Sequence, residues 1–152
     1  MARTRLLLLI EDEPFAADWV KRIVAENFGE RCRIVHICSE REFLVRKRDL
    51  ENMEFSGIIL DVILPWEDGV PMGSGSAFPD QRGPVYEAGI RVFEDIKNSS
   101  VLKNVPLVIY TVTDEDRLVW PEGLSKPTIM SKQSPDFKLV QWMGQVFQFR
   151  SV

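Results

Sequence analysis

The chain is poor in the residues that build zinc sites and disulfide frameworks, with two cysteines and one histidine among 152 residues. Cys32 and Cys38 are six positions apart, with no Cys-x-x-Cys motif and no cluster of histidines and cysteines around them. Zinc centres and disulfide scaffolds both depend on such clusters. We therefore expect two buried thiols that form no disulfide, as in proteins of reducing compartments.

Long hydrophobic runs are also missing. No window approaches the roughly 18 apolar residues that indicate a membrane-spanning helix. The apolar run 6–10 follows Arg3 and Arg5, an order also found in signal peptides, but it ends in the acids 11–13. It is also too short, because a signal sequence needs roughly 7–15 apolar residues. The sequence predicts a cytoplasmic protein that does not contact membranes.

Positive charge is not in excess, since the formal net charge is −4. Surfaces that bind nucleic acids are generally basic, so direct binding to nucleic acid is not expected. A charged fraction of 28% and a hydrophobic fraction of 45% are typical of a globular protein. The length suits one domain, and we expect residues 1–152 to form it.

Five short apolar segments predict β-strands. The run 6–10 and the residues directly before Asp61 are continuously apolar, as in strands buried on both faces of a parallel sheet. The predicted strands are 6–10, 33–38, 57–64, 105–110 and 128–131.

Segments with helical spacing of apolar residues alternate with these strands. Pro14 suits the first turn of one helix and Gly29 its end, while Ser39 and Glu42 form a capping-box pattern at the start of the next. The predicted helices are 14–28, 39–52, 86–97 and 136–149, with one short turn at 114–118. Residues 65–84 are rich in Gly, Pro, Ser and Asp and predict an extended loop.

This alternation predicts the α/β class, with a doubly wound, five-stranded parallel sheet and helices on both faces. Right-handed crossovers leave only a few ways to wind such a sheet. Among them we expect the flavodoxin-like strand order 2-1-3-4-5, in which the ends of the first and third strands lie side by side.

Polar residues at four predicted strand ends then converge on one edge of the sheet. They are Glu11, Asp12, Asp61, Thr111 and Lys132. Neighbouring carboxylates repel each other unless a cation joins them or one takes up a proton, and an all-oxygen ligand set suits Mg²⁺. An aspartate beside Mg²⁺, a lysine and a threonine is equipped to attack a phosphoryl group, because the cations neutralise its oxygens.

In these motifs the chain resembles the receiver domains of two-component response regulators, over essentially its whole length. The resemblance rests on Glu11-Asp12, Asp61 with Pro65 after it, Thr111 and Lys132, each at the expected strand end. It implies that Asp61 accepts a phosphoryl group from the phosphohistidine of a sensor histidine kinase or a phosphotransfer protein.

The resemblance also assigns the remaining residues and the partners. The implied Mg²⁺ ligands are Glu11, Asp12, Asp61 and the backbone carbonyl of Ile63. Thr111 and Lys132 would contact the phosphoryl group. The chain would then signal to a downstream protein by changing conformation, with no output domain and no ordinary enzymatic activity. A homodimer formed through the last helices is a further option that the family offers.

Three residues depart from the family's pattern. Val112 stands where a small residue usually follows the threonine, and it would narrow the approach to the acceptor aspartate. Ile129 replaces the usual switch aromatic, and Gln133 replaces the proline that usually follows the site lysine. Because the acids, the threonine and the lysine of the site are all present, the phosphorylation chemistry is expected to be intact. The three departures instead make the output switch unusual.

Two other functions stay open. Val112 and Ile129 favour a receiver-like module that signals by protein contacts without phosphorylation, through residues 65–84 or the segment after the fourth strand. The site also resembles that of a Mg²⁺-dependent phosphatase. Haloacid-dehalogenase-like phosphatases, however, usually carry a second aspartate two residues after the first, where this chain has Ile63.

Several single residues allow two interpretations. Lys126 precedes a proline, as the family's site lysine does, but it comes before the last strand, so Lys132 is preferred. The family's Asp-Gly pair aligns either with 68–69 or with Gly89. His36, within the second strand, is expected to be structural and away from the site. On the last helix, core positions are expected for Phe137, Trp142, Met143 and Phe147.

Overall fold

The computed structural model describes residues 3–67 and 83–147. These residues form a five-stranded parallel sheet in the order β2-β1-β3-β4-β5, so the predicted order is confirmed. The strands are β1 (Arg5–Ile10), β2 (Cys32–Ile37), β3 (Phe55–Leu60), β4 (Leu107–Thr111) and β5 (Thr128–Ser131). Within the described ranges, no helix combines the length and the apolarity needed to cross a membrane.

The centre of the sheet is formed by β1 and β3. Residues 7–10 of β1 and 57–60 of β3 are all buried, as expected for strands covered on both faces. Ile10 lies opposite Leu60 in the parallel register. The residues that follow these two strands therefore emerge side by side at the carboxyl edge of the sheet.

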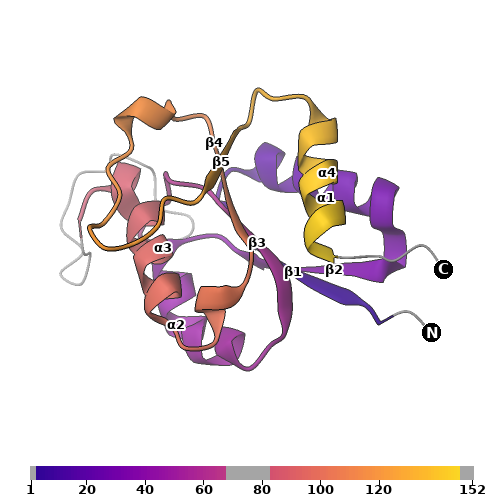
Figure 1. The fold of residues 1–152 in the computed structure, drawn as a ribbon, viewed down its shortest axis with the longest axis horizontal. Coiled ribbons are helices and arrows are strands. Elements are labelled where there is room, and N and C mark those ends of the chain that lie inside the picture. Colours follow the sequence, from indigo (N-terminus) through magenta and orange to yellow (C-terminus); the bar gives the residue numbers. More distant parts are fainter. Residues whose placement is uncertain (1–2, 68–82, 148–152) are drawn as a thin grey trace.

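Helices cover both faces of the sheet (Figure 1). On one face, α1 (Pro14–Phe28) and α4 (Asp136–Phe147) share an apolar core with the strands, in which the rings of Phe28 and Phe147 meet edge to face at 5.1 Å. On the other face, α2 (Glu40–Glu51) and α3 (Ala88–Asn98) share a second core. Because side chains alternate along a strand, the same strands supply both cores.

The caps confirm how the first two helices begin. The Glu13 carboxylate accepts hydrogen bonds from two N–H groups in the first turn of α1. The Ser39 hydroxyl accepts one from the Glu42 N–H at the start of α2, as the capping-box pattern predicts. Glu13 therefore caps α1, and the preceding acids Glu11 and Asp12 have another place in the structure.

The predicted bounds of the third strand, 57–64, are wrong. The strand β3 spans 55–60 and ends directly before Asp61. Val62 and Leu64 lie beyond it and are nevertheless fully buried. Alternating buried residues are the pattern of a strand, which is why sequence alone extends β3 too far. The predicted end of the last helix at 149 and most of the 65–84 loop lie outside the described residues.

The prediction that Phe137 belongs to the core is also wrong, because its side chain is 64% exposed. The buried residues of α4 are Leu139, Met143 and Phe147, spaced four apart along one side of the helix. Phe137 precedes Leu139 by two positions, which places it on the opposite side. Trp142 is half-buried at the edge of the core.

The connection from β4 to β5 contains one short 3₁₀ helix, η4 (Glu115–Arg117), where the sequence predicts a short helical turn. After it, Leu118, Trp120 and Leu124 pack in irregular conformation against the core beside α3. The Trp120 ring meets that of Phe93 edge to face at 5.3 Å. Apolar side chains thus cover this part of the sheet without a helix.

No disulfide joins Cys32 and Cys38, both of which lie in the described part of the chain. Cys32 is buried and Cys38 is half-buried, so the expectation of two buried thiols holds for Cys32 alone. Burial raises the pKa of the Cys32 thiol to about 11. Cys32 therefore stays protonated and unreactive at neutral pH.

Candidate functional site

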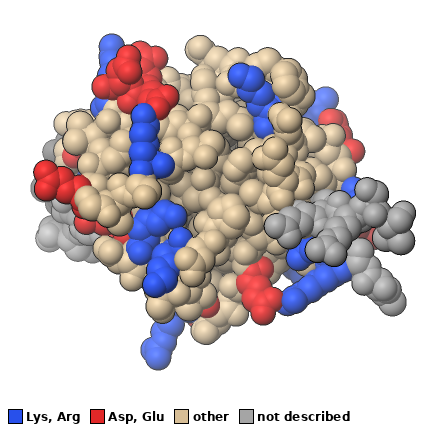
Figure 2. Space-filling model, in the orientation of Figure 1, with Lys and Arg blue, Asp and Glu red and all other residues tan. Residues whose placement is uncertain are grey.

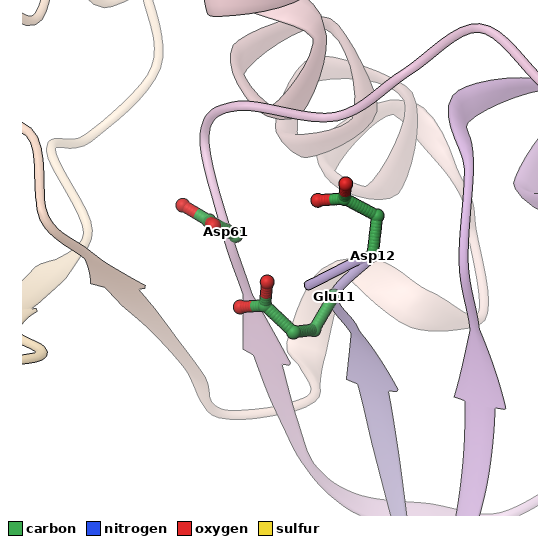
Figure 3. Close-up of side chains that lie close together, drawn as sticks. All are labelled: Glu11, Asp12 and Asp61. Atoms are coloured by element: carbon green, nitrogen blue, oxygen red, sulfur yellow. The ribbon is translucent and has the colours of Figure 1, made fainter. Parts of the chain in front are cut away.

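Three carboxylates lie together at the carboxyl edge of the sheet (Figure 3). Glu11 and Asp12 follow β1, and Asp61 follows β3, the neighbouring strand. Each residue has a carboxylate oxygen within 4.8 Å of those of the other two. Glu11 is 1% exposed and Asp61 is 5% exposed, while Asp12 is half-buried. The predicted grouping of the three acids is present.

Lys132 supplies the positive charge of this cluster. Its backbone N–H donates to the Thr111 carbonyl at 2.9 Å, which ties the end of β5 to the end of β4. Its ammonium lies 2.7 Å from a carboxylate oxygen of Glu11 and 2.7 Å from one of Asp61. Lys126 instead pairs with Glu115 at the exposed surface. Of the two lysines, Lys132 lies at the site.

The start of α3 packs closely on the peptide that joins Asp61 to Val62. The Val62 N–H donates to the Asp61 carboxylate at 2.7 Å, and the Gly89 N–H donates to the Val62 carbonyl at 2.7 Å. A Cβ atom on Gly89 would lie 2.0 Å from the Asp61 carbonyl oxygen. Only glycine permits this approach. Gly89 is thus the glycine in contact with the site, and residues 68–69 lie outside the described ranges.

The charges of the cluster are unbalanced. Burial, and then the negative charge of Asp61, raise the pKa of Glu11 to about 8, against a smaller opposing effect of Lys132. Burial also raises the pKa of Asp12. For Lys132, burial alone would lower the pKa, but Asp61 and Glu11 together raise it. The three carboxylates thus have one ammonium to balance their negative charge. A divalent cation that prefers oxygen ligands would fit among them.

Thr111 and Ile63 lie next to this cluster. Thr111 is buried at the end of β4, and its hydroxyl accepts a hydrogen bond from the Thr113 N–H at 3.2 Å. Ile63 is half-buried, two residues after Asp61. A contact between Thr111 and a phosphoryl group, and metal binding by the Ile63 carbonyl, stay predictions.

A pocket of about 380 Å³ opens beside the site, between the start of α3 and the β4–β5 connection. Its lining is Ile63, Tyr86, Glu87, Ile90, Val112, Thr113, Asp114, Arg117, Leu118 and Val119. The Val112 side chain is 60% exposed there. The residue that departs from the family's pattern after the threonine is therefore a wall of this pocket.

His36 contradicts the expectation that it lies away from the site. Its ring nitrogen Nε2 is 2.7 Å from the Glu11 carbonyl oxygen. Because β2 and β1 are adjacent and His36 lies opposite Leu9, its side chain reaches along the strand to Glu11. The predicted strand order puts the second strand beside the first, and this adjacency is the signal in the sequence from which the contact could have been found.

The raised pKa of Glu11 predicts how stability depends on pH. In the unfolded chain Glu11 releases its proton near its ordinary value of 4.5, whereas the folded protein keeps the proton up to about 8. In the metal-free protein, Glu11 therefore lowers the free energy of unfolding as pH rises from 4.5 to 8, by up to about 1.4 kcal/mol per pH unit. Urea unfolding at a series of pH values with a chelator measures this. The Glu11→Gln variant should lack that part of the slope; an equal slope in both proteins would contradict the prediction.

No protein-family model and no curated protein sequence matches the chain. Solved structures do match. The phosphorylated cyanobacterial phytochrome response regulator RcpA has 18% identity and a TM-score of 0.68 over 98% of this chain and 97% of its own. The Mn²⁺-bound response regulator Rcp1 has 20% identity and a TM-score of 0.63 over 97% of both chains.

A third neighbour is the receiver domain of the sensor histidine kinase PA1611 from Pseudomonas aeruginosa, with a magnesium ion coordinated in its active-site cleft. It has 16% identity and a TM-score of 0.62 over 95% of this chain and 98% of its own. These matches agree with the strand order and with the helices on both faces. The chain has the receiver fold of response regulators.

Proposed function

We propose that this chain is a response regulator receiver whose Asp61 accepts a phosphoryl group from the phosphohistidine of a sensor histidine kinase or a phosphotransfer protein. The observation that carries the proposal is the arrangement at the sheet edge. Lys132 lies 2.7 Å from both Glu11 and Asp61, and Asp12 completes a set of three acids within 4.8 Å. The phosphorylated RcpA and the magnesium-bound PA1611 domain have the same fold and support it.

The proposed metal is Mg²⁺. Its ligands would be Glu11, Asp12, Asp61 and the backbone carbonyl of Ile63. When bound, Mg²⁺ supplies positive charge for the phosphoryl oxygens and for the crowded carboxylates. The raised pKa of Glu11, caused first by burial and then by Asp61, supports a cation at this place.

The chain's own groups orient the acceptor. The Val62 N–H holds one Asp61 oxygen and the Lys132 ammonium holds the other. In the transfer, an Asp61 oxygen bonds to phosphorus while the bond from phosphorus to the donor's imidazole nitrogen breaks. The donor nitrogen keeps the electron pair of that bond. Lys132 neutralises charge on the phosphoryl oxygens, and Thr111 is proposed to donate its hydroxyl proton to one of them.

The output is proposed to be a change in protein contacts. Residues 1–152 would act as one receiver unit and pass the signal to a downstream protein. The β4–β5 connection, all of which the structure describes, follows Thr111 directly and contains a short 3₁₀ helix but no α-helix. New charge on Asp61 would therefore act first on this segment.

The test is the intact mass of the protein after incubation with Mg²⁺ and a small acyl phosphate. The wild type should gain the mass of one phosphoryl group. The gain should disappear in the Asp61→Asn variant and in the presence of a chelator. A wild-type protein that binds Mg²⁺, seen by tryptophan fluorescence, but gains no phosphoryl group would contradict the proposal.

A second candidate is a module that signals by protein contacts alone. The pocket beside the site favours it, because exposed apolar side chains such as Val112 and Val119 line it. In Figure 2, side chains of both signs gather at the upper left, over the β4–β5 connection, whereas the middle of this face is largely uncharged. Phosphoryl uptake by Asp61 separates the two candidates.

A further inference from the structure

His36 makes a contact with the acidic site that the proposed chemistry does not use. It is the single histidine of the sequence and lies half-buried on β2. Its Nε2 atom is 2.7 Å from the Glu11 carbonyl oxygen. A carbonyl oxygen only accepts hydrogen bonds, so Nε2 carries the ring's proton and donates the hydrogen bond. The ring is therefore a donor aimed at the backbone of a candidate metal ligand.

This hydrogen bond completes a set of contacts that fix Glu11. The Glu11 N–H donates to the Ile37 carbonyl at 3.0 Å, which extends the pairing of β1 with β2 by one residue. The Glu11 carboxylate accepts from the Glu13 N–H at 3.1 Å and from Lys132 at 2.7 Å. The carbonyl held by His36 belongs to the peptide that joins Glu11 to Asp12. The orientation of this planar peptide decides how the two carboxylates stand relative to each other.

The sulfur of Cys38 lies beside the same ring. Its Sγ atom is 4.0 Å from Nδ1 and 3.6 Å from Nε2 of His36. The sulfur is nearer to Nε2, the nitrogen that donates to Glu11, than to Nδ1, so it packs against the ring beside that hydrogen bond. The end of β2 thus supports the ring that supports the end of β1.

We propose that His36 is a positioning residue for the metal site: its Nε2–H holds the Glu11–Asp12 peptide, and with it the two carboxylates, in the orientation that binds a divalent cation. Groups that orient metal ligands without touching the metal contribute strongly to affinity, and their loss typically weakens binding about 10- to 100-fold. The inference rests on the proposed function, because that proposal makes the three acids a metal site. Its test, however, measures metal binding and needs no phosphorylation.

Two substitutions isolate the hydrogen bond. Glutamine carries an amide N–H at the same number of bonds from Cβ as His36 Nε2, whereas methionine has the same reach and no donor. The affinity for Mg²⁺ is measured by calorimetry for the full chain. We expect His36→Met to weaken Mg²⁺ binding about tenfold, and His36→Gln to stay within about threefold of the wild type.

A second measurement needs no metal. Hydrogen exchange of the Glu13 amide reports on the Glu11 carboxylate that accepts its bond. His36→Met should speed this exchange, and His36→Gln should not. Ile34→Val, two residues before His36 on the same side of β2, is the control for general loosening of the strand.

The outcomes are distinct. The proposal is overturned if His36→Met leaves the exchange of the Glu13 amide unchanged, or if it leaves the Mg²⁺ affinity unchanged. It is also overturned if His36→Gln or Ile34→Val reduces the Mg²⁺ affinity as much as His36→Met does. If the wild type binds no Mg²⁺, the metal site is absent and the proposal fails with it. If Mg²⁺ binding depends on His36 as expected but Asp61 gains no phosphoryl group, the phosphorylation proposal fails and the positioning role stands.

Discussion

Replacing Gly89 with alanine is expected to lower the free energy of unfolding by about 3 kcal/mol, at the upper end of the usual cost of overpacking. The added Cβ would lie 2.0 Å from the Asp61 carbonyl oxygen and 2.5 Å from the Val62 Cα. Both are backbone atoms, so no side chain can rotate away. Either α3 moves off the sheet edge or the peptide after Asp61 shifts. Urea unfolding measures the loss.

The same substitution should also weaken Mg²⁺ binding, because Asp61 is a proposed ligand and its peptide is the one displaced. Gly144→Ala is the matched control: it lies inside α4, and a Cβ there meets no atom within 4 Å. Alanine is the better helix former, so this variant should be more stable by about 0.5–1 kcal/mol. A Gly89→Ala protein as stable as the wild type would show that α3 does not pack as closely on Asp61 as the structure has it.

The strand order and the acidic site were both predictable from sequence, for one physical reason. A strand buried on both faces is continuously apolar, so β1 and β3 stand out in the sequence together with the polar residue that ends each of them. Parallel strands share one carboxyl edge, and the order of the strands then brings Glu11 next to Asp61. The geometry of the acids followed from local patterns and a general rule of topology.

The contacts that fix the site depend on packing between distant elements, and local patterns carry no signal for them. The His36 ring bonds to a residue 25 positions earlier in the chain, and nothing in the composition of β2 distinguishes a structural histidine from a positioning one. Phe137 follows helical spacing only loosely, and its exposure is decided by which side of α4 meets the sheet. The sequence leaves Gly89 as one of two alternatives, and its close contact with the Asp61 peptide is known only from the fold.

Removing the Glu40 carboxylate, in Glu40→Ala, is expected to cost about 3 kcal/mol, because it leaves a partly buried guanidinium without its main counter-charge. Glu40 is 1% exposed, and its two oxygens accept hydrogen bonds from Arg91 Nε at 2.8 Å and from a second Arg91 nitrogen at 2.7 Å. This two-point geometry is the strong form of the ion pair. Urea unfolding again measures the loss.

Two comparisons identify the cause. Glu26→Ala breaks an exposed pair with Arg22 on α1 and should cost about 0.5 kcal/mol or less. The double variant Glu40→Met, Arg91→Met removes both charges, and it should be much more stable than Glu40→Ala, because no unpaired charge is left. A double variant no better than the single one would mean that packing, and not the unpaired charge, sets the cost.

The Glu40–Arg91 pair also affects the site, because it joins α2 to α3 beside the exit segment, the residues 62–66 that follow Asp61. The Glu40 and Arg41 N–H groups at the start of α2 donate to the carbonyls of Pro65 and Trp66, at 3.0 and 2.9 Å. Loss of the pair should loosen this exit segment, and faster hydrogen exchange of the Arg41 amide would report it. If Glu40→Ala lowers stability but leaves that exchange unchanged, the start of α2 holds the segment without help from α3.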